Sequence, residues 1–195
     1  MIIMKESFIP PKDSDYPIII TPQIYDGETI KMVLEVVLQN PRLDTLVAVA
    51  PFVSPYFSNF LKNTAVKNLV LLINRKDLVP DYVNDAIEKL HDVNFKVTVR
   101  QRPDKSKFMH LKVMIPYVKI ERTITQYGQT KTEISLLPMC AISGSVNFTK
   151  NGITKSDEML VVLKDMYSIA AVERTYDDLV RGSSIRYESP GFSIR

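Results

Sequence analysis

The chain has 195 residues, of which 45% are hydrophobic and 24% are charged, with 6 glycines and 12 prolines. This composition is typical of a folded globular chain of about one domain, and it excludes a disordered or fibrous protein and a mini-protein held by disulfides. The formal net charge of +3 permits a polyanionic partner without requiring one.

The cysteine and histidine content argues against a metal centre or a disulfide scaffold. Cys140 is the single cysteine, and the two histidines are too few to complete a typical zinc site of nitrogen and sulfur ligands. We therefore expect no metal and no other cofactor. Residues 1–10 match neither the apolar core of a signal peptide nor a membrane span of roughly 20 residues, so we expect a cytoplasmic protein with no membrane contact.

The first half of the chain alternates predicted strands and helices. Residues 1–25 contain four prolines and predict an irregular N-terminal arm. Helical spacing of apolar residues then predicts a helix capped by Asp26 and ended by Pro41. In chain order, the next predicted elements are a strand at 45–53, a helix at 55–62, a strand at 68–73, a helix starting near Pro80 and a strand at 95–100.

The second half is richer in strands. It predicts strands at 108–120, 139–143 and 158–163, followed by a helix capped by Asp165 and ended near Gly182. In residues 119–137, apolar residues alternate with polar residues on both sides of Tyr127-Gly128. This pattern fits either a β-hairpin insertion or an ordinary surface loop. The order of elements predicts one α/β domain over residues 1–195, with a mixed β-sheet flanked by helices on both faces.

His110 and Lys112 are the first residues that point to chemistry. They lie two apart in a predicted strand, so their side chains leave the same face roughly 7 Å apart. A lone histidine on an apolar strand is usually a core residue, but a lysine beside it is rarely buried without a partner. This pair therefore predicts a space that accepts an anion.

A second group of polar residues follows the predicted strand at 139–143. Ser145 and Asn147, beside Gly144, supply hydroxyl, amide and backbone donors suited to phosphate oxygens, although such strings are also common in turns. Glu158 opens the next apolar strand and could accept the Nδ1 proton of a histidine, or simply be an exposed residue at a strand end.

The pattern His110-x-Lys112, Gly144-Ser145-x-Asn147 and Glu158 resembles the signature of the phospholipase D superfamily, in particular its small single-motif endonucleases. The resemblance is specific over residues 107–163. The family's motif usually has an Asp five positions after the lysine, where this chain has Tyr117, and the predicted hairpin makes this chain longer between the two motifs. The resemblance implies a phospholipase D-like fold and metal-independent phosphodiesterase activity.

This resemblance also implies roles for the residues. His110 would attack phosphorus to form a phosphohistidine, with Lys112, Asn147 and Ser145 holding the phosphate oxygens and Glu158 completing the catalytic set. The leaving group needs a proton from a second acid, which a histidine bonded to phosphorus cannot supply. His91 is expected to cap a helix, so we expect the second histidine to be another copy of His110 in a homodimer.

Basic residues just before the motif indicate the substrate. Four basic residues in this segment form either a solvent-exposed connection between strands or a rim, meaning a basic surface beside His110 that contacts phosphates: Arg100, Arg102, Lys105 and Lys107. On the second interpretation, Arg75 and Lys76 would extend this rim. A nucleic-acid backbone fits such a rim, so we expect an endonuclease, with DNA favoured over RNA as the partner. The alternatives are a non-catalytic nucleic-acid-binding dimer and a phospholipid phosphodiesterase, although we find no amphipathic basic helix for a lipid surface.

Overall fold

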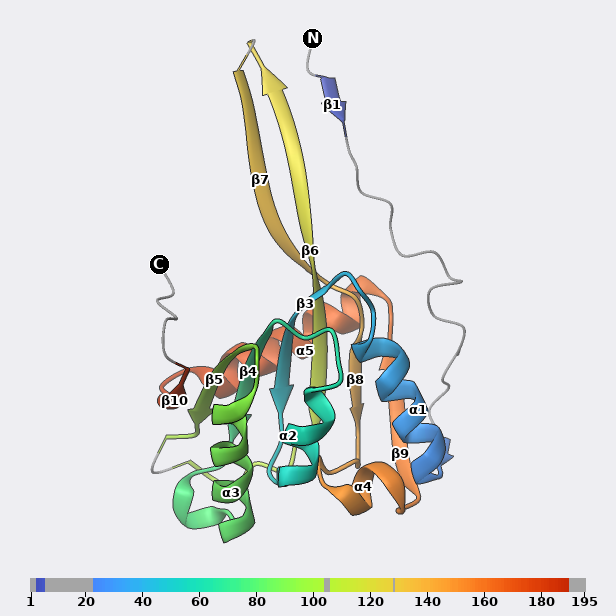
Figure 1. Ribbon diagram of the computed structural model, residues 1–195, viewed down its shortest axis with the longest axis vertical. Coiled ribbons are helices and arrows are strands. Elements are labelled where there is room, and N and C mark those ends of the chain that lie inside the picture. The colour runs from blue at the N-terminus through green and yellow to red at the C-terminus, as the bar shows by residue number, and fades with distance from the viewer. Residues whose placement is uncertain (1–2, 6–22, 104–105, 128, 190–195) are drawn as a thin grey trace.

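The computed structural model describes residues 3–5, 23–103, 106–127 and 129–189, and within them one mixed β-sheet carries helices on both faces (Figure 1). The strands are β1 (Ile3–Lys5), β2 (Gln23–Tyr25), β3 (Leu43–Val49), β4 (Asn68–Ile73), β5 (Lys96–Gln101), β6 (Val113–Gln126), β7 (Gln129–Pro138), β8 (Ala141–Gly144), β9 (Glu158–Leu163) and β10 (Ser184–Glu188). The α-helices are α1 (Gly27–Leu38), α2 (Pro55–Leu61), α3 (Asp81–Lys89), α4 (Lys150–Thr154) and α5 (Met166–Val180), and short 3-10 turns occupy Lys76–Leu78 and Leu90–Asp92.

The strand order follows from how the strands are connected. β3, β4 and β5 pair in parallel, because α2 and α3 lie in the crossovers between them. β6 lies antiparallel to β3, and β8, β9 and β2 extend the sheet in antiparallel fashion. The resulting order is β10-β5-β4-β3-β6-β8-β9-β2, with β1 and β7 paired to β6. The expected mixed α/β fold is confirmed.

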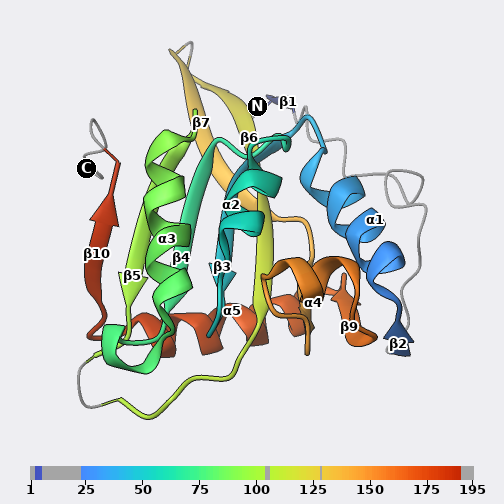
Figure 2. The ribbon, with the colours of Figure 1, turned by 60° about the horizontal axis from the view of Figure 1, so that its bottom comes forward.

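The two faces of the sheet bury two separate sets of apolar side chains. Along β6, Met114 and Val118 enter the larger cluster beneath α1, α2 and α3, whereas Val113 and Ile115 enter the smaller cluster on the side of α5. This division is the two-residue alternation of an extended strand. Figure 2 shows α1, α2 and α3 on one side of the sheet and α5 crossing the other.

The helix ends follow the predicted capping residues. The Asp26 carboxylate accepts a hydrogen bond from the Thr29 backbone N–H at 2.8 Å, and Asp165 accepts one from Ser168 at the same distance. These caps start α1 and α5. Gly182, just beyond α5, has a φ of 74°, a conformation that glycine adopts without a steric penalty. The predicted starts of both helices and the predicted end of α5 are thus confirmed, whereas α1 ends at Leu38, three residues before Pro41.

The strand predicted at 108–120 differs most from the structure. β6 begins at Val113 and continues to Gln126, where it turns back as β7 with a regular antiparallel register. Residues 119–137 are therefore a β-hairpin rather than an irregular excursion, and it extends beyond the body of the molecule (Figure 1). Tyr127 at its tip has a φ of 51°, as a tight hairpin turn demands, while residue 128 lies outside the described residues.

Three short strands were missed by the sequence analysis. β1 and β2 lie in the segment predicted to be irregular, where they pair with β6 and β9, and β10 pairs with β5 after α5. The rest of the N-terminal arm, residues 1–2 and 6–22, lies outside the described residues. Among the helices that are described, none combines the length and apolar character needed to cross a membrane.

Tyr117, which stands where the related motif usually has Asp, fixes β6 to α5. Its hydroxyl donates a hydrogen bond to Glu173 Oε1 at 2.7 Å. Burial, followed by this bond to the Glu173 carboxylate, raises the pKa of the Tyr117 phenol well above its usual range. An Asp at this position would place a second carboxylate near Glu173, so the tyrosine suits this particular helix.

We expect Tyr117→Phe to lower the free energy of unfolding by about 1–2 kcal/mol at pH 7, because Glu173 loses its donor. The raised pKa means that the folded state resists ionisation of Tyr117, so stability is lost as the pH rises above about 10, the ordinary pKa of tyrosine. Tyr117→Phe should lose less stability over that range than the wild type. Urea unfolding at several pH values measures both effects, and equal stability of the two proteins at pH 7 would contradict the assigned role.

Candidate active site

The predicted catalytic residues come together at one edge of the sheet, namely the edge formed by the ends of neighbouring strands and not by an outermost strand. His110 and Lys112 directly precede β6, Ser145 and Asn147 follow β8, and Glu158 is the first residue of β9. Because β6, β8 and β9 are neighbours and antiparallel, the start of β6 and of β9 lies beside the end of β8. In Figure 1 this edge lies at the foot of the sheet, opposite the hairpin.

His110 and Lys112 are in direct contact. The Lys112 Nζ lies 3.1 Å from both ring nitrogens of His110 and donates to the His110 carbonyl oxygen at 3.2 Å. An ammonium group only donates hydrogen bonds, so this contact suits an unprotonated ring nitrogen. The His110 side chain is exposed and therefore accessible to a substrate, whereas Lys112 is only 4% exposed.

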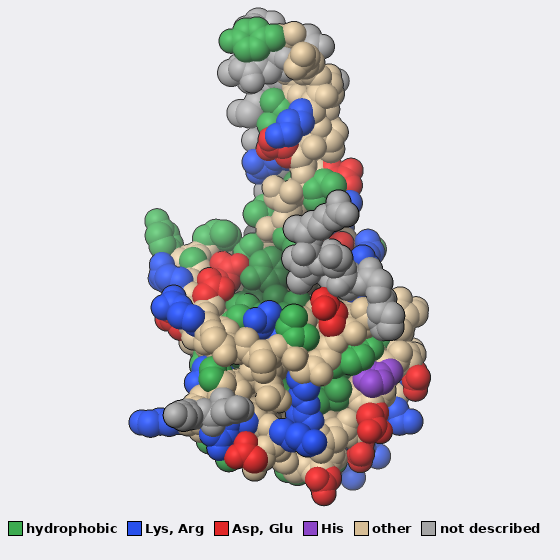
Figure 3. Space-filling model, turned by 90° about the vertical axis from the view of Figure 1, so that its left-hand side faces the viewer, with side chains coloured by type: hydrophobic (Ala, Val, Ile, Leu, Met, Phe, Trp, Pro, Cys, Tyr) green, Lys and Arg blue, Asp and Glu red, His purple; other side chains and the backbone are tan. Residues whose placement is uncertain are grey.

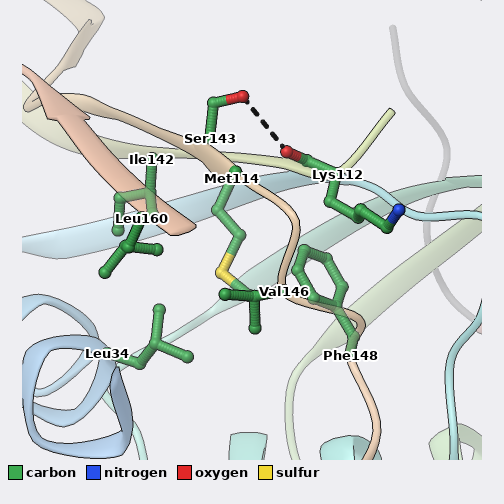
Figure 4. Close-up of a pocket in the computed structure, with 9 residues that line it drawn as sticks. Leu34, Lys112, Met114, Ile142, Ser143, Val146, Phe148 and Leu160 are labelled. Carbon is green, nitrogen blue, oxygen red and sulfur yellow. Dashed lines mark hydrogen bonds between the residues drawn. The ribbon is translucent and has the colours of Figure 1, made fainter. Parts of the chain in front are cut away.

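The burial of Lys112 shapes its electrostatics. Burial lowers the pKa of its ammonium group, and the nearby Glu158 carboxylate partly offsets that shift. The stem of Lys112 lines a small apolar pocket with Phe148, Met114 and Leu160, and the volume of this pocket, about 10 Å³, is no larger than one water molecule requires (Figure 4). A phosphodiester does not fit there, so a substrate must approach from the exposed side of His110.

Ser145 connects the turn after β8 to the start of β9. Its hydroxyl donates to the Glu158 carboxylate and accepts the backbone N–H of Met159 at 2.9 Å. Among the described contacts, the Glu158 carboxylate is bonded to Ser145 and not to His110. Gly144 permits this arrangement, because a Cβ atom there would overlap the Met159 carbonyl oxygen. Ser145 thus holds the carboxylate in place.

Asn147 is held from its backbone and leaves its side chain unpaired. Its carbonyl oxygen accepts the Thr149 N–H at 2.8 Å, and Gly152 packs so closely against this backbone that a side chain there would clash. The Asn147 Oδ1 atom is buried without a hydrogen-bond partner in the described structure. A half-buried amide with spare hydrogen-bonding capacity at this edge is suited to bind a polar ligand.

Asn74 is a residue of this site that the sequence analysis missed. It follows β4 and is fully buried, and its side chain amide pairs with the backbone of Met109 in both directions. The Asn74 Nδ2 donates to the Met109 carbonyl at 2.9 Å, and the Met109 N–H donates to Asn74 Oδ1 at 2.8 Å. This pair of bonds fixes the chain immediately before His110. The only sequence signal was an amide directly after a buried strand.

The basic residues predicted to contact nucleic acid have different environments. Arg100 donates to the Ser183 hydroxyl at 2.8 Å and Arg102 to the Leu179 carbonyl at 3.0 Å, so both hold the end of α5. Lys107 is exposed, and Lys105 lies outside the described residues. Of the residues expected to extend this rim, Arg75 pairs with Asp77 at 2.7 Å and Lys76 is exposed.

The remaining candidate groups lie apart from this edge. The His91 ring stacks on Tyr187 of β10, with ring centroids 4.1 Å apart, at the far end of the strand order from β9. Burial raises the pKa of the Cys140 thiol to about 12, so it is a poor nucleophile. In the described part of the chain, no three His, Cys, Asp or Glu side chains are grouped so as to hold a metal ion.

An exposed imidazole, a buried ammonium, an amide and a carboxylate at the ends of adjacent strands are the groups needed to bind and attack a phosphate ester. The family model described as cardiolipin synthase, PLD-like domain, matches residues 34–180. The chain therefore belongs to this family of the phospholipase D superfamily. No curated protein matches the chain.

Two solved structures share the fold. One is Nuc, a phospholipase D family member from Salmonella typhimurium, with a TM-score of 0.54 and 15% sequence identity over 87% of this chain and 99% of that chain. The other is NucT from Helicobacter pylori, with a TM-score of 0.51 and 12% identity over 85% of this chain and 98% of that chain. At these identities, the likeness establishes the arrangement of the elements.

Proposed function

We propose that this protein is a metal-independent phosphodiesterase that cleaves nucleic acid, DNA in preference to RNA, through a phosphohistidine formed on His110. The observation that carries the proposal is the exposed His110 ring in contact with the buried Lys112 ammonium, at the edge that also holds Asn147 and Glu158. Membership of the phospholipase D superfamily supports the same chemistry.

In the proposed first step, a nitrogen of His110 forms a bond to phosphorus while the bond to the leaving oxygen breaks. Lys112 and Asn147 stabilise the charge that builds on the non-bridging oxygens. Ser145 keeps Glu158 beside Lys112, where the carboxylate favours the charged form of the lysine despite its burial. Water then attacks phosphorus, and the bond between phosphorus and His110 breaks.

We further propose that two chains share one catalytic site. The leaving oxygen needs a proton and the attacking water needs a base, and in the described residues His110 is the single histidine at this edge. In a two-fold dimer, the partner subunit's His110 would supply both functions. Exposed apolar side chains next to the site suit such an interface: Phe108 is 44% exposed and Met159 is 48% exposed.

The proposal that the substrate is nucleic acid rests on the positively charged side chains near the site. Lys107 is exposed three residues before His110, and Lys76 is exposed in the turn after β4. We propose that Arg100, Arg102 and Lys105 belong to the same surface, with Arg100 and Arg102 also fixing α5. Contacts of this kind with backbone phosphates weaken steeply as the salt concentration rises, because the release of counterions then contributes less to binding.

The direct experiment offers labelled single-stranded and double-stranded DNA, RNA and phospholipid vesicles to the wild type in excess EDTA. We expect DNA cleavage that persists in EDTA and falls sharply between low and moderate salt. Sedimentation of the same sample should show an assembly of at least two chains and no monomer. Hydrolysis of phospholipid alone would replace nucleic acid as the substrate class, and binding of DNA without cleavage would identify a non-catalytic DNA-binding protein.

Asn74 provides a test of how His110 is positioned. We expect Asn74→Ala to lower kcat by about 10–100-fold with little change in KM, because the chain before the nucleophile loses both of its fixing bonds. Ser58→Ala is the matched control. The Ser58 hydroxyl is equally buried, but it donates to the Ala86 carbonyl and not to the segment that precedes His110. A similar loss of kcat in both variants would mean that general destabilisation, rather than positioning, explains the effect.

A further inference from the structure

The outer edge of β7 has no strand partner among the described residues. β6 pairs with β7 on one side and with β1 on the other. Every residue from 129 to 136 is exposed, and Figure 3 shows the hairpin standing clear of the body. The strand is regular, and its only proline is the last residue, Pro138. Such an edge is a template for pairing with another strand, and proteins usually protect it.

The register of the hairpin shows which backbone groups are available at this edge. Gln126 pairs with Gln129 across a two-residue turn, and pairs that flank such a turn exchange hydrogen bonds within the hairpin. The alternation of an antiparallel ladder therefore turns the N–H and C=O groups of Thr130, Thr132 and Ile134 outward. These groups can pair with another strand without disturbing β6.

The charges on β7 fit a second copy of the same strand. We propose that β7 pairs in antiparallel fashion with β7 of another molecule, about a two-fold axis at Thr132. This register places Lys131 opposite the partner's Glu133, and Glu133 opposite the partner's Lys131. Moving the axis to Lys131 or to Glu133 would place like charges opposite each other, which is unfavourable. The existing Lys131–Glu133 ion pair is exposed, so exchanging it for pairs between molecules costs little.

This contact is separate from the candidate active site and does not rest on the proposed function. β6 has 14 residues, so its hairpin end lies about 45 Å from the end beside Lys112. A molecule paired through β7 keeps its His110 edge open for substrate or for the other two-fold contact. In each molecule, β1, β6 and β7 lie side by side at the hairpin. The pairing would join these three strands of each molecule into one sheet of six strands.

Disulfide cross-linking tests the register directly. In the proposed pair, the two Thr132 Cα atoms are about 5.5 Å apart, within the range that a disulfide spans. We expect Thr132→Cys to form a covalent dimer under mild oxidation. Thr130→Cys is the matched control, because its two copies would be separated by about 13 Å along the strand. The buried Cys140 should leave the wild type unlinked. Equal cross-linking of Thr132→Cys and Thr130→Cys, or none in either, would overturn the proposal.

The charges offer a second test in the Thr132→Cys background. Lys131→Glu should slow cross-linking by about tenfold, because the substituted carboxylate would face the partner's Glu133 in both halves of the pair. Adding Glu133→Lys exchanges the two charges and should restore the rate. An unchanged rate in the Lys131→Glu variant, with the hairpin still folded by circular dichroism, would rule out the register set by these charges.

Discussion

His110→Ala is expected to lower the rate of phosphodiester cleavage by at least about a thousandfold, because it removes the atom that bonds to phosphorus. The His110 side chain is exposed, and its ring contacts Lys112 and lies 6.0 Å from the Phe108 ring centroid. Its removal therefore opens little space in the core, and the variant should fold normally. The measurement is a single-turnover cleavage assay with excess enzyme.

His91→Ala is the matched control for this variant, because His91 is the other histidine of the chain. It stacks on Tyr187 at the far side of the sheet, so its loss should leave the cleavage rate near that of the wild type. If His110→Ala retained substantial activity, or if His91→Ala lost as much, the nucleophile would be another group.

Lys112→Met separates the catalytic role of the lysine from its role in packing. Met has a similar length and is apolar, so it can occupy the buried space beside Phe148 and Met114. The rate should fall by about 10²–10³-fold, because the substrate oxygens lose a buried cation.

Burial lowers the pKa of Lys112, so keeping this side chain charged at pH 7 costs the wild type stability. That cost should decrease as the pH rises toward about 10.

The stability of Lys112→Met distinguishes catalysis from folding. Removing a buried charge in favour of an apolar side chain is often neutral or stabilising, so the midpoint of thermal unfolding should stay the same or rise. Reduced activity together with a lower unfolding midpoint would instead indicate that Lys112 supports the fold. Activity near the wild-type level would exclude it as a ligand of the reacting phosphate.

The regular parts of the fold were predictable because they depend on local signals. The bounds of β4 and β9 match the apolar runs in the sequence, and Asp26 and Asp165 begin α1 and α5 as predicted. The start of β6 was not predictable, because residues 106–112 are held partly by Asn74 and do not pair as a strand. β2 and β10 are formed by pairing with distant strands, which leaves no periodic signal in such short segments.

The candidate site was predictable only in part, because Asn74 gave no clear signal in the sequence and the contacts between the side chains gave none. The spacing of His110, Lys112, Asn147 and Glu158 identified side chains that the fold brings to one edge. Which of them touch depends on the packing of three strands. The bond between Ser145 and Glu158, and the contacts of Arg100 and Arg102 with the end of α5, could be recognised only in the structure.

Rapid-quench mapping of the reaction shows whether His110 forms a covalent bond to phosphorus. Wild-type protein is mixed with DNA in EDTA, quenched under alkaline conditions during the first turnover, digested and analysed by mass spectrometry. We predict a nucleotide adduct on the peptide that contains His110, absent from His110→Ala. Cleavage without any adduct, or an adduct on a different residue, would show that His110 is not the nucleophile.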